Sequence, residues 1–226
     1  MSSQLANILV QSGALKFGSF TTKSGRSSPY FINWGHLCRG RDLSYIAGLY
    51  ADALNEHFGD DQYCLFGPAY KGIPLVCMAA EAGYRKYQKN YRITYNRKEK
   101  KDHGEGGVLI GHQFEAGDNI VVVEDVLTGG TSVRESIQLL KAHGANLAGI
   151  LVGMDRQEKG LGTLSTKTEL ERDLGVPVVS LLNLDQLIGS IASEDFQGKS
   201  LVSPEIKEKI VAYRTNWGGE SLGSSV

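Results

Sequence analysis

A single strand–loop–helix pattern in the middle of the sequence restricts the fold more than any other feature. A run of mostly β-branched residues, 119–123, ends in two adjacent carboxylates, Glu124 and Asp125. A glycine-containing loop follows, and then an amphipathic helix pattern over 132–143 that Gly144 ends. A continuous β-branched run is typical of a strand that is buried on both faces, as in a parallel sheet covered by helices. The pattern therefore predicts one strand–helix unit of an α/β fold.

The remaining sequence alternates between strand-like and helix-like segments, which predicts a Rossmann-like, mostly parallel sheet flanked by helices. A length of 226 residues allows one large domain, so we expect residues 1–226 to form a single domain. Further strands are expected at 64–67, 91–97, 147–154 and 177–182. The 91–97 pattern alternates more than the others, which indicates a place nearer a sheet edge. Two stretches, 17–29 and 97–107, interrupt the rhythm, and the tail from Gly218 is expected to fray.

Capping and turn residues predict where the other helices begin and end. One helix is expected to run from a cap at Asp42 to about Phe58, and a second from Pro74, in its first turn, to near Gly83. A third is expected to start at a capping box over 166–169, whose first residue is Thr166, and a last one to start at Ser203 and Pro204. On the last helix, Ile206, Ile210 and Val211 are expected to share the buried side.

Charge, hydropathy and cysteines argue against several classes of protein. Lys and Arg total 24 against 25 Asp and Glu, and this balance gives no general attraction to nucleic acid or to an anionic membrane. The sequence has no apolar run of about 18 residues for a transmembrane helix, and its start lacks the pattern of a signal peptide. The cysteines form no closely spaced pair, and we expect Cys64 and Cys77 to be reduced core residues. The sequence thus predicts a cytoplasmic protein without nucleic-acid or membrane partners.

The loop after the central strand has the chemistry of a sugar-phosphate site. In an open parallel sheet, ligands bind beyond the carboxyl ends of the strands. The helix start offers unpaired N–H groups, and two glycines let these amides approach a phosphate, while neighbouring hydroxyls can donate: Thr128, Gly129, Gly130, Thr131 and Ser132. Glu124 and Asp125 are placed to accept hydrogen bonds from sugar hydroxyls or to hold a metal indirectly. The alternative is a capped turn with solvated acids.

Several cations elsewhere in the sequence could bind a polyanion such as a diphosphate, through charge-assisted hydrogen bonds. They are Lys71, Arg97, Lys98, Lys101 and His103. Gly72 can bring backbone N–H groups close to the same phosphates, whereas we interpret Lys100 as a solvated charge. The segment 97–107 has no apolar residue and ends in glycines, so it is expected to move and to close over bound substrate. A solvated charged face is the alternative interpretation of this segment.

Four stretches together resemble one family closely, in the same order and spacing. They are FTTKSGRSSPYF at 20–31, GPAYKGIP at 67–74, YNRKEKKDHGEGG at 95–107 and VVVEDVLTGGTS at 121–132, joined by Asp155 and Arg156. The family is the orotate phosphoribosyltransferases, which are type I phosphoribosyltransferases, and the resemblance covers most of the chain. Glu124 stands where many type I members have Asp. The resemblance implies the type I phosphoribosyltransferase fold, with a small N-terminal hood formed by about residues 1–40 plus C-terminal elements, and a flexible catalytic loop over 97–107.

The resemblance also implies an activity: transfer of the 5-phosphoribosyl group from phosphoribosyl diphosphate to orotate in de novo pyrimidine biosynthesis. It implies that phosphoribosyl diphosphate is bound by Tyr70, Lys71, Gly72, Arg97, Lys98, Lys101, His103, Glu124, Asp125, Val126, Leu127, Thr128, Gly129, Gly130, Thr131 and Ser132. It assigns catalysis to Lys101, His103 and Asp125, with Lys101 first in stabilising the departing charge.

For orotate, the matching positions are Lys23, Phe31, Ile32, Thr128 and Arg156. Lys23 and Arg156 are cations suited to the carboxylate of the base, and Phe31 can pack on its ring, whereas Ile32 replaces an aromatic residue found in some members. Mg²⁺ is the implied cofactor, held mainly through diphosphate, ribose hydroxyls and water. The family pattern further implies a homodimer in which Lys101 and His103 reach the active site of the neighbouring subunit.

Two other functions stay open at this stage. The same scaffold can serve another base such as a purine, although the 23–31 stretch is not expected in purine enzymes. A regulator that senses phosphoribosyl diphosphate and binds nucleic acid is a further possibility. The balanced charge and the cationic segment 97–107 argue against it, since such a regulator would be expected to carry a basic extension or a helix-turn-helix.

Overall fold

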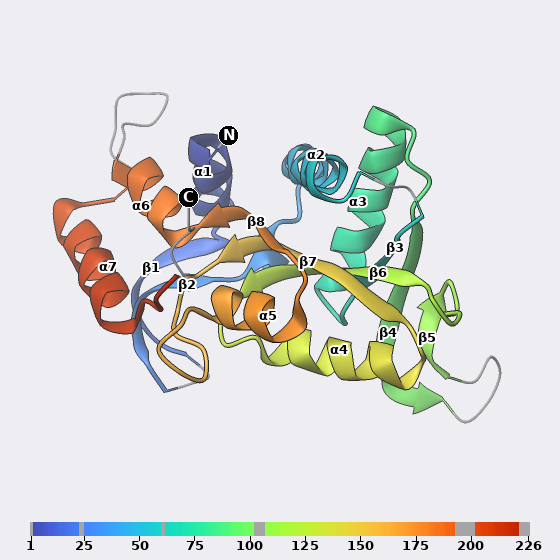
Figure 1. Ribbon diagram of the computed structural model, residues 1–226. Helices are drawn as coiled ribbons and strands as arrows, with labels where there is room; N and C mark the ends of the chain where they lie inside the picture. The colour runs from blue at the N-terminus through green and yellow to red at the C-terminus, as the bar shows by residue number, and fades with distance from the viewer. Residues whose placement is uncertain (1, 23–24, 60–61, 102–106, 193–201, 222–226) are drawn as a thin grey trace.

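The centre of the molecule is a six-stranded sheet with the strand order β5-β4-β3-β6-β7-β8 (Figure 1). The computed structural model describes residues 2–22, 25–59, 62–101, 107–192 and 202–221, without the side chains of 99–101 and 192. The strands are β3 (Cys64–Gly67), β4 (Arg92–Lys101), β5 (Gly107–Gly111), β6 (Asn119–Leu127), β7 (Asn146–Asp155) and β8 (Val178–Asn183). Neighbouring strands pair in parallel, except that β4 and β5 are antiparallel. The expected mostly parallel α/β fold is confirmed, and β4 lies next to the edge strand.

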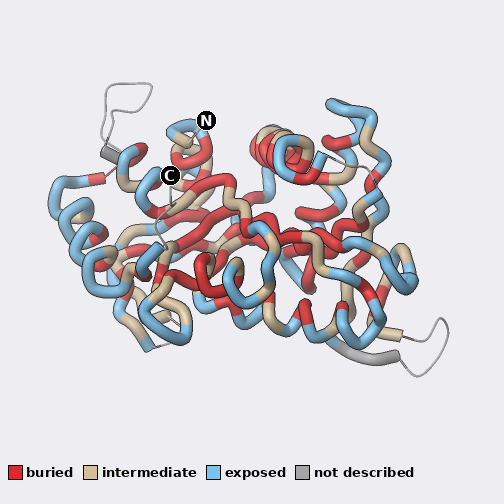
Figure 2. Tube along the Cα trace, in the orientation of Figure 1, coloured by how far each residue is buried: buried red, intermediate tan, exposed pale blue. Residues whose placement is uncertain are grey.

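Helices cover both faces of this sheet. On one face lie α2 (Gly40–His57) and α3 (Gly72–Tyr87), and on the other lie α4 (Thr131–Ala142) and α5 (Thr166–Leu174). The valines of β6 alternate between the two cores: Val121 and Val123 pack on the side of α2 and α3, and Val122 packs on the side of α4. Buried backbone therefore runs through the middle of the molecule (Figure 2), as expected for a strand without a solvent face.

The N-terminal and C-terminal segments come together near the β8 edge of the sheet (Figure 1). They comprise α1 (Ser2–Gln11), the antiparallel pair β1 (Leu15–Thr21) and β2 (Ser27–Ile32), the short 3-10 helix η1 (Trp34–His36), α6 (Leu184–Ala192) and α7 (Pro204–Trp217). Helix α7 contacts β2 and α6, and α1 contacts β1 and α6. We call α1, β1, β2, α6 and α7 together the terminal unit.

The hairpin of the terminal unit was not expected from the sequence, because 17–29 is rich in serine, glycine and basic residues. The structure shows why the pattern misleads. In β2, the buried residues Ser28, Tyr30 and Ile32 alternate with more exposed ones, so the strand has the usual period of two. One of its inward positions is a polar serine, which removes the apolar signal.

Two helices begin or end away from the expected residues. Helix α2 starts at Gly40, so Asp42 lies in the first turn and does not cap it. There its carboxylate still interacts favourably with the helix dipole. Helix α3 continues past Gly83 to Tyr87. Gly83 serves packing, since a Cβ there would lie 2.9 Å from the ring of Tyr91.

Other local expectations also need correction. Ser165, and not Thr166, caps α5, because its hydroxyl accepts a hydrogen bond from the Thr168 N–H at 3.2 Å. On α7, Ile210 is buried as expected, but Val211 is 44% exposed and Tyr213 takes the inward position. Cys64 is buried, whereas Cys77 is exposed because it follows the buried Val76 by about 100° around the helix.

Two expectations about irregular segments fail in part. Residues 97–101, expected in a loop, continue strand β4, and Lys101 pairs with Gly107 across the hairpin. The tail expected to fray from Gly218 is held as far as Glu220, since Gly218 bridges Glu158 and Glu220 bridges Leu164. Residues 222–226 lie outside the described part of the chain. No helix in that described part is both long and apolar enough to span a membrane.

Candidate active site

The loop between β6 and α4 lies at the carboxyl end of the sheet, where the sequence predicts a phosphate site. Gly130 precedes the helix in the left-handed conformation, with φ of 74°, and a Cβ on it would lie 2.9 Å from Thr166 Cγ2. The loop is tied to α5, because Thr166 Oγ1 donates to the Thr128 carbonyl at 2.6 Å. Within the described residues no side chain caps the start of α4. Its first N–H groups thus suit an anionic ligand.

The two carboxylates at the end of β6 are buried and held in place. Ser132 Oγ donates to Glu124 Oε2 at 2.5 Å, and Tyr50 Oη donates to the backbone carbonyl of Glu124 at 2.8 Å. Asp125 Oδ2 accepts a hydrogen bond from Lys71 Nζ at 2.8 Å. Burial, and then the nearby Asp125 charge, raises the pKa of Glu124 to about 7. Glu124 therefore changes its charge close to neutral pH.

The loop after β3 and the end of strand β4 bring two cations, Lys71 and Lys98, to the same end of the sheet. Lys71 reaches Asp125, and its side chain is 49% exposed, so it can also meet a ligand. Lys98 Nζ lies 5.0 Å from the centre of the Tyr70 ring, which is itself largely exposed. The backbone N–H of Ala69 donates to Asn96 Oδ1 at 2.8 Å, which joins this loop to β4. Gly67 and Gly72 pack so closely that a Cβ on Gly67 would lie 2.3 Å from the Gly72 carbonyl.

Arg97 lies on β4 and is half-buried, whereas three other predicted cations are only partly described or not described. The backbone of Lys101 ends that strand, but its side chain lies outside the described part, as do His103 and Lys23. Their roles stay predictions.

The residues predicted to contact a base differ in exposure. Phe31 is 43% exposed, and its ring centre lies 5.5 Å from that of Phe20 on the neighbouring strand. Ile32 packs in the core, so it presents little surface to a ligand. Thr128 is half-buried in the loop between β6 and α4. Phe31, the aromatic residue of the predicted set, therefore has a ring that a base can reach.

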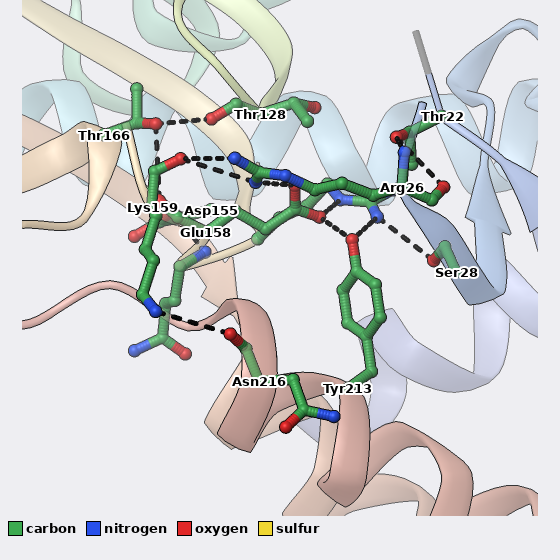
Figure 3. Close-up of polar contacts among 12 residues, drawn as sticks. Thr22, Arg26, Ser28, Thr128, Asp155, Glu158, Lys159, Thr166, Tyr213 and Asn216 are labelled. Carbon is green, nitrogen blue, oxygen red and sulfur yellow. Dashed lines mark hydrogen bonds and ion pairs between the residues drawn. The ribbon is translucent and has the colours of Figure 1, made fainter. Parts of the chain in front are cut away.

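Arg156 lies directly after β7 and is buried, so the salt bridge that it forms is not at the surface. Its Nε donates to Glu158 Oε1 at 2.6 Å, and its Nη2 donates to Ser28 Oγ at 3.2 Å (Figure 3). Its guanidinium carbon lies 4.5 Å from the centre of the Tyr30 ring. Although burial alone acts to lower the pKa of Arg156, the neighbouring Tyr30, Glu158 and Tyr213 raise it, so the side chain remains charged.

Sequence reasoning missed Tyr50, Ser28, Glu158 and Tyr213. Tyr50 contacts the site from a segment far away along the chain, and no local pattern marks it. Ser28 lies within the 20–31 stretch, but its contact with Arg156 spans 128 positions of sequence. Glu158 offered a weak signal, because it follows Arg156 by only two residues and carries the opposite charge.

A polar cavity of about 380 Å³ lies beside this site. Its lining includes Asp155, Gln157, Lys167 and Arg172, but none of the residues predicted to bind phosphate or base. Burial raises the pKa of Asp155 to about 6. The candidate site is therefore the set of loops around Glu124, Lys71 and Arg156, and not this cavity.

Comparison with known proteins gives a consistent result. The family model for the phosphoribosyl transferase domain matches residues 42–173. The chain is 44% identical to the orotate phosphoribosyltransferase of Photobacterium profundum and 42% identical to that of Erwinia tasmaniensis, in each case over 95% of this chain and 97% of the relative. The crystal structure of orotate phosphoribosyltransferase from Francisella tularensis is similar with a TM-score of 0.77 and 32% identity, covering 96% of this chain and 100% of that chain.

Proposed function

The chain belongs to the orotate phosphoribosyltransferase family, and we propose that it transfers the 5-phosphoribosyl group from phosphoribosyl diphosphate to orotate, giving orotidine 5'-phosphate and diphosphate. This is a step of de novo pyrimidine biosynthesis. The observation that supports it most is the identity of 42–44% over 95% of the chain, which extends beyond the phosphoribosyl transferase domain at 42–173. The similarity thus includes the terminal unit, whose strand β2 carries Phe31 and Ile32, two of the residues expected to contact the base.

The proposed binding of the sugar phosphate follows from the β6–α4 loop. The 5-phosphate would accept hydrogen bonds from the N–H groups at the start of α4 and from the hydroxyls of Thr128 and Thr131. Glu124 and Asp125 would accept hydrogen bonds from the ribose hydroxyls, and their existing partners keep both carboxylates oriented. Positive charge grows on the ribose as the diphosphate leaves, so two carboxylates beside the sugar also favour the transition state electrostatically.

The diphosphate would lie against the cationic residues at the ends of β3 and β4. Lys71, Arg97 and Lys98 belong to this set, and Lys101 and His103 are proposed to complete it from the neighbouring subunit of a homodimer. Charge-assisted hydrogen bonds from such a set stabilise the negative charge that the leaving group gains. The terminal unit is proposed to be the hood over the base.

Mg²⁺ fits this arrangement as a cofactor bound mainly by substrate. Glu124 and Asp125 offer the hard oxygen atoms that Mg²⁺ prefers, and they would hold it indirectly, together with substrate oxygens and water. When bound, the ion would supply positive charge that offsets the negative charge of the diphosphate. A cytoplasmic location is proposed from the three free thiols, Cys38, Cys64 and Cys77, which suit a reducing compartment.

Loss of orotate absorbance in the presence of phosphoribosyl diphosphate tests the function directly. We expect consumption of orotate that depends on Mg²⁺ and is abolished by a chelator. Uracil, hypoxanthine and adenine, supplied under the same conditions, are expected to give no nucleotide. Formation of a purine nucleotide instead of orotidine 5'-phosphate would contradict the assigned base. Tight RNA or DNA binding without any product would favour the regulator.

Glu124 should set the pH dependence of phosphoribosyl diphosphate use. Because its pKa is raised to about 7, it is mostly protonated at pH 6 and mostly ionised at pH 8, and only the ionised form has both oxygens as acceptors. We therefore expect kcat/KM for phosphoribosyl diphosphate to rise with pH through about 7. Glu124→Gln should lower the plateau and remove this inflection. The substrate titrates in the same way with the wild type and with the variant, so the ratio of their two pH profiles reports Glu124 alone. An unchanged inflection in Glu124→Gln would contradict the assignment of the pH dependence to Glu124.

A further inference from the structure

Glu158 is the centre of a buried polar cluster next to the proposed base site (Figure 3). Its side chain is 1% exposed, and both carboxylate oxygens have partners. Oε1 accepts hydrogen bonds from Arg156 Nε at 2.6 Å and from Tyr213 Oη at 2.8 Å, and Oε2 accepts one from Arg26 Nη1 at 3.1 Å. A carboxylate this deeply buried is stable only with such charged and hydrogen-bonded partners.

These contacts leave one side of Arg156 available. Its Nε is occupied by Glu158, and its Nη2 lies 3.2 Å from Ser28 Oγ and 3.4 Å from Tyr213 Oη. The Tyr30 ring covers one face of the guanidinium. Among the described residues no side chain or carbonyl accepts a hydrogen bond from Nη1. The planar guanidinium is therefore held in one orientation, with donors left for a further acceptor.

The cluster also connects three parts of the chain. Arg26 and Ser28 come from the β1–β2 hairpin, Arg156 and Glu158 follow β7, and Tyr213 lies on α7. Arg26 reinforces the connection, because it donates to the Lys159 carbonyl at 3.4 Å and stacks over the Trp217 ring at 5.0 Å. The hairpin and the last helix are thus attached to the residue that the base carboxylate is expected to meet.

We propose that Glu158 is a positioning residue that aims Arg156 at the carboxylate of the pyrimidine base. Two arginines share this one carboxylate, so the trio keeps one positive charge, which suits an anionic ligand group. Tyr213 supports Glu158 from α7 and makes the C-terminal helix part of base recognition. This inference rests on the proposed function, since it needs orotate as the substrate.

Glu158→Gln tests the proposal, because the amide keeps the shape of the side chain but loses its charge. We expect KM for orotate to rise at least about tenfold, which is the order of effect of losing one hydrogen bond between charged groups. Turnover at saturation and KM for phosphoribosyl diphosphate should stay within about threefold of wild type, since the β6–α4 loop is untouched. Inhibition by the orotate analogue that carries a carboxamide in place of the carboxylate should change less than twofold.

Control variants separate positioning from general damage. Glu205→Gln removes an exposed pair with Lys209 on the same helix as Tyr213 and should change none of these constants. Tyr213→Phe keeps the ring and removes the hydroxyl bonded to Glu158, so a rise of about two- to fivefold in KM for orotate is expected, with kcat unchanged. Tyr213→Phe decides the matter if Glu158→Gln does not fold.

Three outcomes have distinct meanings. An unchanged KM for orotate in folded Glu158→Gln would overturn the inference, and so would an equal loss in kcat and in both KM values, which indicates a structural role alone. If the wild-type protein does not consume orotate at all, the proposed function fails rather than the role of Glu158.

Discussion

Replacing Lys101 by alanine should lower kcat by a factor of about 10² to 10³, while the dissociation constant of orotate changes less than about twofold. The departing diphosphate gains negative charge in the transition state, and a positioned cation stabilises that charge more than it stabilises the ground state. Lys101 ends strand β4, on the edge hairpin whose other strand begins at Gly107. Single-turnover rates with saturating substrates measure the loss, and equilibrium binding measures the affinity for orotate.

Lys100 provides the matched control, since it is adjacent and has the same side chain. We interpret Lys100 as a solvated charge, so Lys100→Ala should keep kcat within about twofold of wild type. Near-normal turnover of Lys101→Ala would remove it from the catalytic set. Equal losses in the two variants would indicate that the charge of the segment matters, and not the particular residue. Because Lys101 is proposed to act in the neighbouring subunit, mixing Lys101→Ala with Asp125→Asn should restore a fraction of the activity.

Asp125→Asn should lower kcat/KM for phosphoribosyl diphosphate by a factor of about 10² to 10³. The substitution removes a charge that is proposed to face the sugar and that lies 2.8 Å from Lys71 Nζ. The variant loses an acceptor for a ribose hydroxyl and the electrostatic stabilisation of the cationic sugar. Steady-state kinetics at saturating orotate measure the effect.

Asp173→Asn serves as the control for Asp125→Asn. Asp173 forms an exposed pair with Arg172 at 2.7 Å, so its removal should leave kcat/KM within about twofold. Thermal unfolding of both variants shows whether the loss at Asp125 reflects stability. A folded Asp125→Asn enzyme with kcat/KM within threefold of wild type would contradict the role given to the acid pair.

The parts of the fold that follow from local pattern could be predicted from the sequence. The valines of β6 indicate a strand buried on both faces, and the start of α4 falls within one residue of its expected place. The place of the β6–α4 loop, with its glycines and hydroxyls next to a helix start, follows from the same reasoning, whereas its binding of phosphate stays a proposal. The hairpin β1–β2 was missed because the inward Ser28 hides the alternation.

The partners of the site residues could not be predicted, because they depend on long-range packing. Lys71 reaches Asp125 across 54 positions of sequence, and Arg156 reaches Ser28 across 128. The buried state of Arg156 depends in addition on Tyr30 and Tyr213, from opposite ends of the chain. Residue types indicate what a side chain can bind, but only the fold shows which of these partners it meets.

The β1–β2 hairpin and α7 both contact Glu158, and this affects the order in which the parts of the site are synthesised. The β6–α4 loop is held by β7 and by Thr166 of α5, so all of its partners named above have been synthesised once α5 is complete. The cluster around Arg156 still lacks Tyr213, which follows about forty residues later. The residues proposed to bind the sugar phosphate are therefore made before the last member of the cluster that is proposed to orient Arg156, and removal of α7 would take Tyr213 from that cluster alone.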